Sequence, residues 1–183
     1  MLEIAVLGLL NESPMHGYEL RKRLSSLLGT FRAFSYGSLY PTLRRLSEAG
    51  WITEETSLEP SAARSRRGRR VYHLTADGKE HLADLLGEVG PDAFDDEGFG
   101  ARLAFFAQTR SDIRLQILEG RRRRVEEQRD GMRSSLARTG ERLDRYTRTL
   151  HEHGLESVDR EVRWLTELIE NERSGARPTS AEK

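Results

Sequence analysis

The chain has 183 residues, of which 30 are basic, 30 are acidic and none is cysteine, so its balanced charge identifies no partner by itself. Without cysteine the sequence excludes disulfides, thiolate nucleophiles and cysteine-based zinc sites. No apolar run approaches the ~20 residues of a membrane-spanning helix, and the basic start of a secretion signal is missing, so we expect a soluble, cytoplasmic chain with no membrane partner.

The N-terminal region predicts helices followed by a β-hairpin. Leu39, Leu43 and Leu46 lie four and three residues apart, which indicates one apolar face of a helix, and Gly50 is placed to end that helix in a left-handed conformation. Two segments rich in β-formers flank a polar loop, and Thr75 is placed to cap the helix that follows. The predicted elements are helices over 2–10, 16–28 and between Ser35 and Gly50, strands over 51–57 and 69–75, and a helix over 76–86.

The C-terminal region predicts a helical arm. An acidic, glycine- and proline-containing stretch separates it from the first region, and from Leu115 the residues repeat at alternating steps of three and four, as in a heptad seam. We expect a helix over 115–150, a break at His153-Gly154 and a last helix over 157–171. The predicted domains are a winged helix-turn-helix over 1–87, a linker over 88–100, a helical dimerisation and effector region over 101–173, and a disordered tail over 174–183.

The helix before Gly50 carries polar groups that suit a DNA groove. Hydroxyls can bond to phosphates and base edges, whereas the two arginines near its far end favour phosphate contact. The alternative is an ordinary surface helix with two exposed arginines. The residues predicted to face DNA are Ser35, Tyr36, Ser38, Tyr40, Thr42, Arg44 and Arg45.

The hairpin carries a cluster of cations. Five arginines fall within seven residues at its tip and return strand, where a wing meets the phosphate backbone or the minor groove, although a solvated charge run is the alternative. Tyr18, near the start of the second helix, is either a phosphate contact or a core residue with its hydroxyl at the edge. The arginines of the predicted wing are Arg64, Arg66, Arg67, Arg69 and Arg70.

The arm offers a dimer seam and a possible effector site. Arginines 121–124 surround the helix, which favours salt bridges to Glu126, Glu127, Glu161 or Glu167 over an anionic effector site, and the aromatic residues are either core or ligand-stacking groups. Residues predicted for dimerisation are Leu115, Leu118, Val125, Met132, Leu136, Leu143, Tyr146, Val162, Leu165 and Ile169. Possible effector contacts are Phe105, Arg122, Arg129 and Trp164.

Nothing in the sequence predicts an enzyme, a metal site or a cofactor. There is no glycine-rich phosphate loop, no metal-ligand motif and no serine in a nucleophile elbow. His151 and His153 have no third ligand nearby in sequence, so we interpret them as cations near the C-terminal end of a helix.

Five segments of the N-terminal region carry motifs that are specific in combination. They are Leu7-Gly8-Leu9-Leu10, Met15-His16-Gly17-Tyr18-Glu19-Leu20, residues 38–46, Gly50-Trp51-Ile52 and residues 69–78. In combination they resemble the PadR family of bacterial transcriptional regulators. The resemblance covers most of the first eighty-odd residues and extends to the second region only in general layout. It implies two winged helices in a homodimer, a pseudo-palindromic operator, repression relieved by a small molecule, and family tyrosines at Tyr18 and Tyr40.

From these features we expect a DNA-binding transcriptional regulator, a homodimeric repressor whose operator binding responds to an effector. One helix from each protomer would enter the major groove at half-sites ~34 Å apart. The alternative is a protein-interaction module in which the winged helix and the arm assemble a complex.

Overall fold

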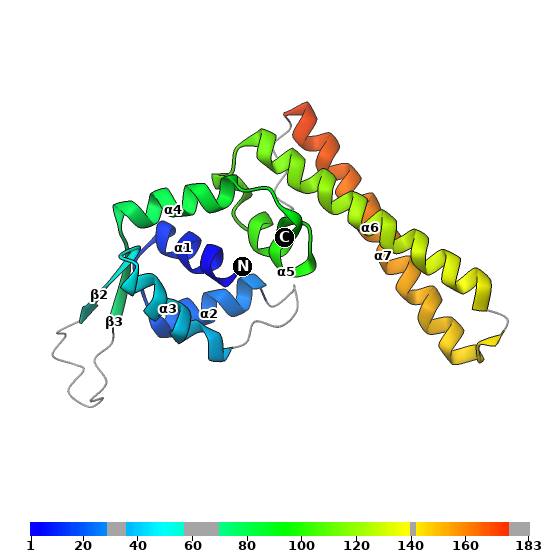
Figure 1. The fold of residues 1–183 in the computed structure, drawn as a ribbon, viewed down its shortest axis with the longest axis horizontal. Helices are drawn as coiled ribbons and strands as arrows, with labels where there is room; N and C mark the ends of the chain where they lie inside the picture. The colour runs from blue at the N-terminus through cyan, green and yellow to red at the C-terminus, as the bar shows by residue number, and fades with distance from the viewer. Residues whose placement is uncertain (29–35, 57–69, 140–141, 176–183) are drawn as a thin grey trace, which may run out of the picture. The chain divides into compact units, whose positions relative to one another are not determined.

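The computed structural model describes residues 1–28, 36–56, 70–139 and 142–175. The described chain is mainly helical with a small three-stranded antiparallel sheet, which confirms the predicted fold class (Figure 1). It divides into two compact units. The first unit combines Met1–Glu88 with Asp96–Arg110, and the second combines Val89–Asp95 with Ser111–Lys183.

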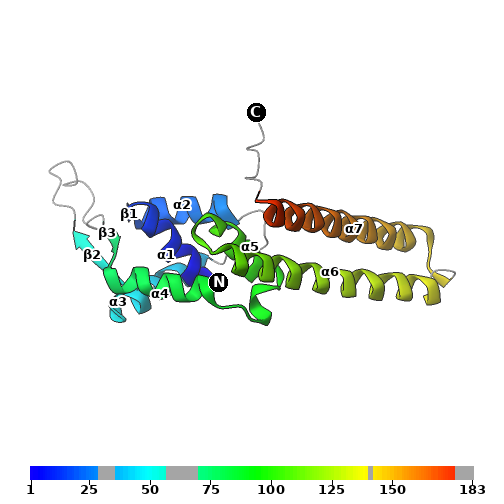
Figure 2. The ribbon, with the colours of Figure 1, turned by 90° about the horizontal axis from the view of Figure 1, so that it is seen from above.

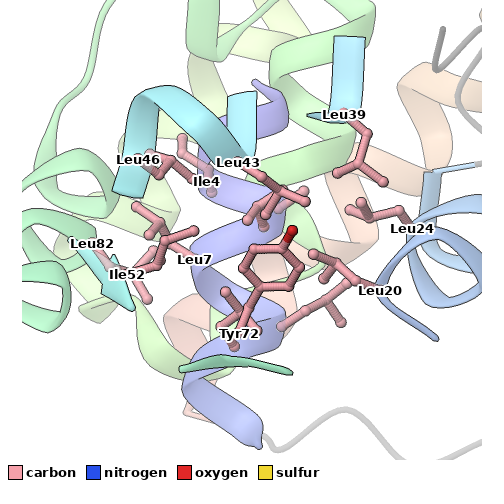
Figure 3. Close-up of a cluster of buried hydrophobic side chains, with 14 of the residues drawn as sticks. Ile4, Leu7, Leu20, Leu24, Leu39, Leu43, Leu46, Ile52, Tyr72 and Leu82 are labelled. Carbon is pink, nitrogen blue, oxygen red and sulfur yellow. The ribbon is translucent and has the colours of Figure 1, made fainter. Parts of the chain in front are cut away.

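The first unit is built around its N-terminal helix, α1 (Leu2–Glu12). Every residue from Ile4 to Leu10 is buried, because this helix is apolar on all sides and such helices pack with neighbours all round. The surrounding helices are α2 (Gly17–Leu28), α3 (Leu39–Glu48) and α4 (Ala76–Gly87). Their leucines converge on α1 in one core (Figure 3).

The sheet contains the predicted hairpin and one strand that was not predicted. The hairpin consists of β2 (Ile52–Thr56) and β3 (Arg70–Leu74), paired antiparallel. The additional strand, β1 (Met15–His16), pairs with the other edge of β3, so that Met15 lies opposite Tyr72. Two residues are too few to show an alternating pattern, so the second helix was predicted to start at His16 although it starts at Gly17.

The junction between the third helix, the hairpin and the fourth helix is tightly bonded. Gly50 adopts the predicted left-handed conformation (φ 77°). Thr75 caps α4 as predicted, its hydroxyl accepting from the Gly78 N–H at 3.0 Å and donating to the Gly50 carbonyl at 2.8 Å. A side chain at Gly78 would overlap the Trp51 carbonyl oxygen, so this corner requires glycine.

Much of the expected linker over 88–100 is structured. Residues 91–93 form the short helix η3 (Pro91–Ala93), and residues expected to be linker begin α5 (Asp96–Leu103), which is followed by η4 (Phe106–Gln108). The helix therefore starts inside the expected linker and before residue 101, where the sequence placed the start of the helical region. Asp96 and Glu97 occupy the first turn of α5, where acidic groups favour the helix dipole, so the charge that suggested a linker marks a helix start.

The arm is a pair of long helices and not one continuous helix over 115–150. Helix α6 (Ser111–Thr139) ends before Leu143, and α7 (Arg145–Ser174) starts after Asp144, whose carboxylate accepts from the Tyr146 and Thr147 N–H groups at 2.9 and 3.1 Å. The predicted break at His153-Gly154 lies inside α7. A side chain at Gly154 would lie 3.0 Å from Met132 Cε, so this glycine accommodates a close approach of the two helices.

The two long helices run side by side in opposite directions (Figure 2). Apolar residues of both are buried between them, and ion pairs join them along their length. The buried apolar residues are Ile117, Leu118, Val125, Val158, Val162, Leu165 and Ile169. The interhelical pairs join Arg114 to Glu172, Arg121 to Glu161, Arg129 and Arg133 to Asp159, and Arg173 to Glu119. In the described parts of the chain, no helix is long and apolar enough to span a bilayer.

Candidate nucleic-acid interface

Helix α3 has one buried face and one exposed face. Leu39, Leu43 and Leu46 are each at most 1% exposed, which confirms the predicted apolar stripe. Tyr40 is 60% exposed and Arg44 lies at the surface on the other side of the helix. The short helix η1 (Tyr36–Ser38) precedes α3, so exposed Ser38 lies at the start of the same surface. An exposed face with hydroxyls and a cation beside an anchored leucine face has the form of a groove-reading helix.

Tyrosines from three elements meet beside Gly17. A side chain at Gly17 would lie 3.3 Å from the Tyr72 ring and 3.9 Å from the Tyr40 ring, so its absence lets both rings approach the start of α2. Tyr18, the next residue, is 77% exposed, which excludes the alternative that it is a core residue. Tyr72 itself is buried, pointing into the leucine core (Figure 3), and burial together with the nearby Glu54 charge raises the pKa of its phenol.

Two predicted cations lie at the surface of this unit, each beside a carboxylate. Arg44 donates to Glu48 one turn later at 2.9 Å, and Arg70 donates to Glu54 across the hairpin at 2.6 Å. Both guanidinium groups are well exposed, so these pairs are weak in water and the cations can turn to a phosphate.

Arg45 is placed differently from its neighbour. Its guanidinium donates at 2.6 Å to Glu3 in the first turn of α1, and the other oxygen of Glu3 lies 2.7 Å from His81 Nε2 of α4. The His81 ring stacks on Trp51 with ring centroids 3.5 Å apart. Burial raises the pKa of Glu3, but the hydrogen bonds from Arg45 and His81 outweigh it and hold that pKa below its ordinary value.

Other predicted DNA contacts are only partly described. Thr42 is half-buried, and Tyr36 opens η1 while its side chain lies outside the described part of the chain. Ser35 and the wing arginines Arg64, Arg66, Arg67 and Arg69 lie outside the described residues.

The residues predicted for dimerisation divide into two groups. One group is buried within the arm of a single chain, because the heptad seam packs α6 against α7. The other group is at least partly accessible, and Tyr146 is 83% exposed. The buried group is Leu118, Val125, Val162, Leu165 and Ile169, and the accessible group is Leu115, Met132, Leu136, Leu143 and Tyr146.

The possible effector contacts do not form one site. Phe105 is 2% exposed and fills the first unit's core beneath Gly8, where a side chain on that glycine would overlap its ring. In the arm, Arg122 Nε lies 3.9 Å from Glu126, Arg129 Nε lies 3.2 Å from Asp130, and Trp164 is 38% exposed. Each of the two arginines thus lies beside a carboxylate, but Arg122 Nε is buried and has no hydrogen-bond partner among the described residues.

The salt bridging predicted for arginines 121–124 is present between Arg121 and Glu161, whereas Glu3 and His81 were not singled out from the sequence. Arg121, one of four consecutive arginines, is buried and donates to Glu161 at 2.6 and 2.8 Å and to the Phe94 carbonyl at 3.0 Å. Glu3 and His81 join α1, α3 and α4. The signal for Glu3 was its position as the one charged side chain in the apolar stretch 2–10, where a carboxylate needs a partner.

Within the described residues, no group of three or more histidine, cysteine, aspartate or glutamate side chains is placed to hold a metal ion. The described part of the first unit presents tyrosines, hydroxyls and cations at its surface, and these groups can contact DNA.

Comparison with known proteins gives matches to the N-terminal part of the chain. Residues 6–84 match the family described as the transcriptional regulator PadR-like family. The chain is 31% identical over 86 residues to the negative transcriptional regulator PadR of Bacillus subtilis, and 30% identical over 84 residues to a probable transcriptional regulator of Mycobacterium tuberculosis. The matches cover 47% and 46% of this chain but only 45% and 42% of those relatives.

Solved structures were compared with the chain as well. Bacillus subtilis PadR in complex with operator DNA is 21% identical, with a TM-score of 0.44 over 93% of this chain and 98% of that one. The same protein in complex with p-coumaric acid gives 21% identity and a TM-score of 0.43 over 94% and 98%.

The matched family and both relatives are transcriptional regulators and not enzymes, which is the class predicted from the sequence. The match ends before α5, so it concerns the winged helix and not the arm. Over residues 6–84, the chain therefore matches the PadR-like family of transcriptional regulators.

Proposed function

We propose that the chain is a homodimeric repressor that binds a pseudo-palindromic operator through α3 and the wing and responds to a small-molecule effector. The observation that carries the proposal is the exposed face of α3, where Tyr40 and Arg44 reach the surface while the opposite face is locked into the core. The sequence similarity to a negative regulator supports repression as the direction of control.

In the proposed complex, Ser38 and Tyr40 enter the major groove, and Tyr18, Arg44 and Arg70 contact flanking phosphates. Tyrosine and serine hydroxyls both donate and accept, so they suit base edges as well as phosphates. The wing arginines add to the phosphate contacts, and their cluster favours DNA over a protein partner, which is the alternative function.

Operator binding is tested by fluorescence anisotropy on the DNA upstream of the chain's own gene. The expected result is specific binding that falls in Tyr40→Ala, because removing a groove-reading side chain costs ~1–3 kcal/mol. The matched control is Arg163→Ala, an exposed residue of the arm. Equal, weak binding by wild type and Tyr40→Ala to operator and scrambled DNA would instead support the protein-interaction alternative.

A second copy of the chain is the proposed partner of the arm. Tyr146 and Leu150 are 83% and 68% exposed on α7, and exposed apolar side chains that lie close together mark interaction surfaces. Leu150→Ser and Tyr146→Ser are expected to weaken the dimer in sedimentation velocity, with exposed Arg163→Ser on the same helix as control. A monomeric wild type at micromolar concentration would contradict the proposal.

Effector control requires an effector that binds the free and the operator-bound protein with different affinities. Trp164, Arg122 and Arg129 of the arm stay the proposed contacts, since they offer an aromatic ring and cations. A suitable first probe is p-coumaric acid, which is bound by Bacillus subtilis PadR and combines a ring with a carboxylate. Calorimetry with and without operator should give different affinities; identical affinities for every probe that binds would contradict effector control.

A further inference from the structure

Two consecutive arginines of α3 have different surroundings. Arg44 is 82% exposed and pairs with Glu48 of its own helix, itself 65% exposed. Arg45 is 56% exposed but pairs with Glu3 of α1, which is only 19% exposed. The first pair lies wholly on the solvent side of one helix, whereas the second joins two helices. Breaking the Arg44–Glu48 pair should therefore have a different consequence from breaking the Arg45–Glu3 pair.

Glu3 is bonded through both of its oxygens. Oε2 accepts from Arg45 at 2.6 Å and Oε1 lies 2.7 Å from His81 Nε2, which donates when that nitrogen carries a proton. A shielded carboxylate at the start of an apolar helix is costly unless such partners satisfy it. One carboxylate thus connects α1, α3 and α4.

His81 also contacts the end of α3 through Trp51. His81 stacks on Trp51, and Trp51 follows Gly50, the left-handed residue that ends the helix. The Trp51 carbonyl accepts from the Thr75 N–H at 3.1 Å, which fixes it to the start of α4. The C-terminal half of α3 is therefore held through both a side chain and the backbone, and the helix angle at its exposed face depends on these contacts.

We propose that Arg45 is a positioning residue, which acts through Glu3 and His81 to hold α3 at the angle that DNA binding needs, and that it is not a phosphate contact. This inference rests on the proposed function of DNA binding. The sequence-based assignment as a DNA contact is kept for Arg44 and replaced for Arg45.

The decisive comparison is Glu3→Gln against Glu48→Gln. Both remove one negative charge from beside an arginine of α3, so their general effect on attraction to DNA is the same. Glu48→Gln frees Arg44 and should leave operator affinity equal or higher. Glu3→Gln should lower it by about tenfold, which corresponds to ~1.4 kcal/mol. If Arg45 were a phosphate contact, Glu3→Gln would free it and raise affinity, which would overturn the proposal.

The salt dependence of binding gives an independent readout. Arg44→Met should reduce the slope of log affinity against log salt by ~0.9 for each phosphate that is no longer neutralised. Arg45→Met should lower affinity and leave that slope unchanged, since the number of neutralised phosphates stays the same. A slope reduced equally in both variants would overturn the assignment of Arg45.

A melting experiment tests the contact without DNA. In a Trp164→Phe background, Trp51 fluorescence follows the first unit, because these are the two tryptophans of the chain. Glu3→Gln and Arg45→Met should each lower Tm, and the double variant should melt close to either single one. Fully additive losses would overturn the coupling. A wild type that bound no DNA would overturn the proposed function instead, while this cycle would still decide whether Glu3 and Arg45 act together.

Discussion

The two units of the chain are each stabilised by a different kind of internal contact. The first unit encloses an apolar helix, α1, on all sides, and its polar contacts include the Thr75 corner and the bonds of Glu3 to Arg45 and His81. The second unit has one apolar seam between two helices and a series of ion pairs beside it. A core enclosed on all sides determines a single position for α3, whereas a seam with charged flanks tolerates changes in sequence. The family match covers residues 6–84, which belong to the first unit, and no part of the arm.

The largest expected effect contrasts two glycines at which a side chain would overlap a neighbour. Gly78→Ala meets the backbone carbonyl of Trp51, which cannot move without opening the corner, so the first unit should lose ~3 kcal/mol or more. Gly120→Ala in the arm meets the ring of Phe94, a side chain that can turn, so the second unit should lose only ~1–3 kcal/mol. Chemical denaturation followed by Trp51 in Trp164→Phe, and by Trp164 in Trp51→Phe, separates the units. Equal losses of stability in Gly78→Ala and Gly120→Ala would contradict the expected difference between the units.

The ion pairs of the arm should differ among themselves according to burial. Glu161→Gln removes the carboxylate that pairs with Arg121, whose side chain is 7% exposed, and should cost ~1.5–3 kcal/mol. Glu119→Gln breaks a pair in which Arg173 is 59% exposed and should cost no more than ~1 kcal/mol. Urea denaturation monitored by Trp164 measures both. Similar costs would mean that the buried pair adds nothing beyond a surface pair.

Acid should weaken each unit through a different carboxylate. Hydrogen bonds from Arg114 and Ser111 outweigh partial burial and lower the pKa of Glu172, and the pKa of Glu3 is lowered as well. A group with a depressed folded pKa stabilises the fold above its unfolded pKa, and that stability disappears as pH falls through the folded value. Each group can contribute a slope of at most ~1.4 kcal/mol per pH unit.

Two variants assign the acid response. Glu3→Gln should flatten the acid limb of the stability curve reported by Trp51, and Glu172→Gln should flatten the limb reported by Trp164. Melts at several pH values between neutral and acid measure both limbs. A variant that flattened the limb of both units would show that the units unfold together and that the comparison between them fails.

The smallest expected effect concerns glycines inside the arm. Gly131→Ala on α6 has nothing within 4 Å and should stabilise the arm by ~0.8–1.0 kcal/mol through helix propensity. Gly154→Ala on α7 should gain less, because Met132 Cε would lie 3.0 Å from the new methyl group. Thermal melts reported by Trp164 compare them. A loss at Gly154 larger than the propensity gain would show that the close approach of α6 and α7 cannot relax.

Sequence patterns predicted the winged helix well because its signals are local and dense. The apolar stripe of α3, the left-handed Gly50 and the Thr75 cap each follow from residues within a few positions, and all three are present. The arm was predicted less well, because its contacts join residues that are far apart in the sequence. A heptad pattern does not say whether its partner is another chain or the next helix, so the buried leucines and valines between α6 and α7 were assigned to a dimer.

The sequence by itself predicted the class of fold, the apolar stripe of α3 and the resemblance to the PadR-like family, since periodicity and turn residues are properties of neighbouring positions. Only the tertiary structure decided which charges act together. Glu3, Arg45 and His81 are far apart in sequence, and so are Arg121 and Glu161. Their contacts depend on how helices pack, and adjacent residues such as Arg44 and Arg45 reach different surroundings because a helix turns them to different sides.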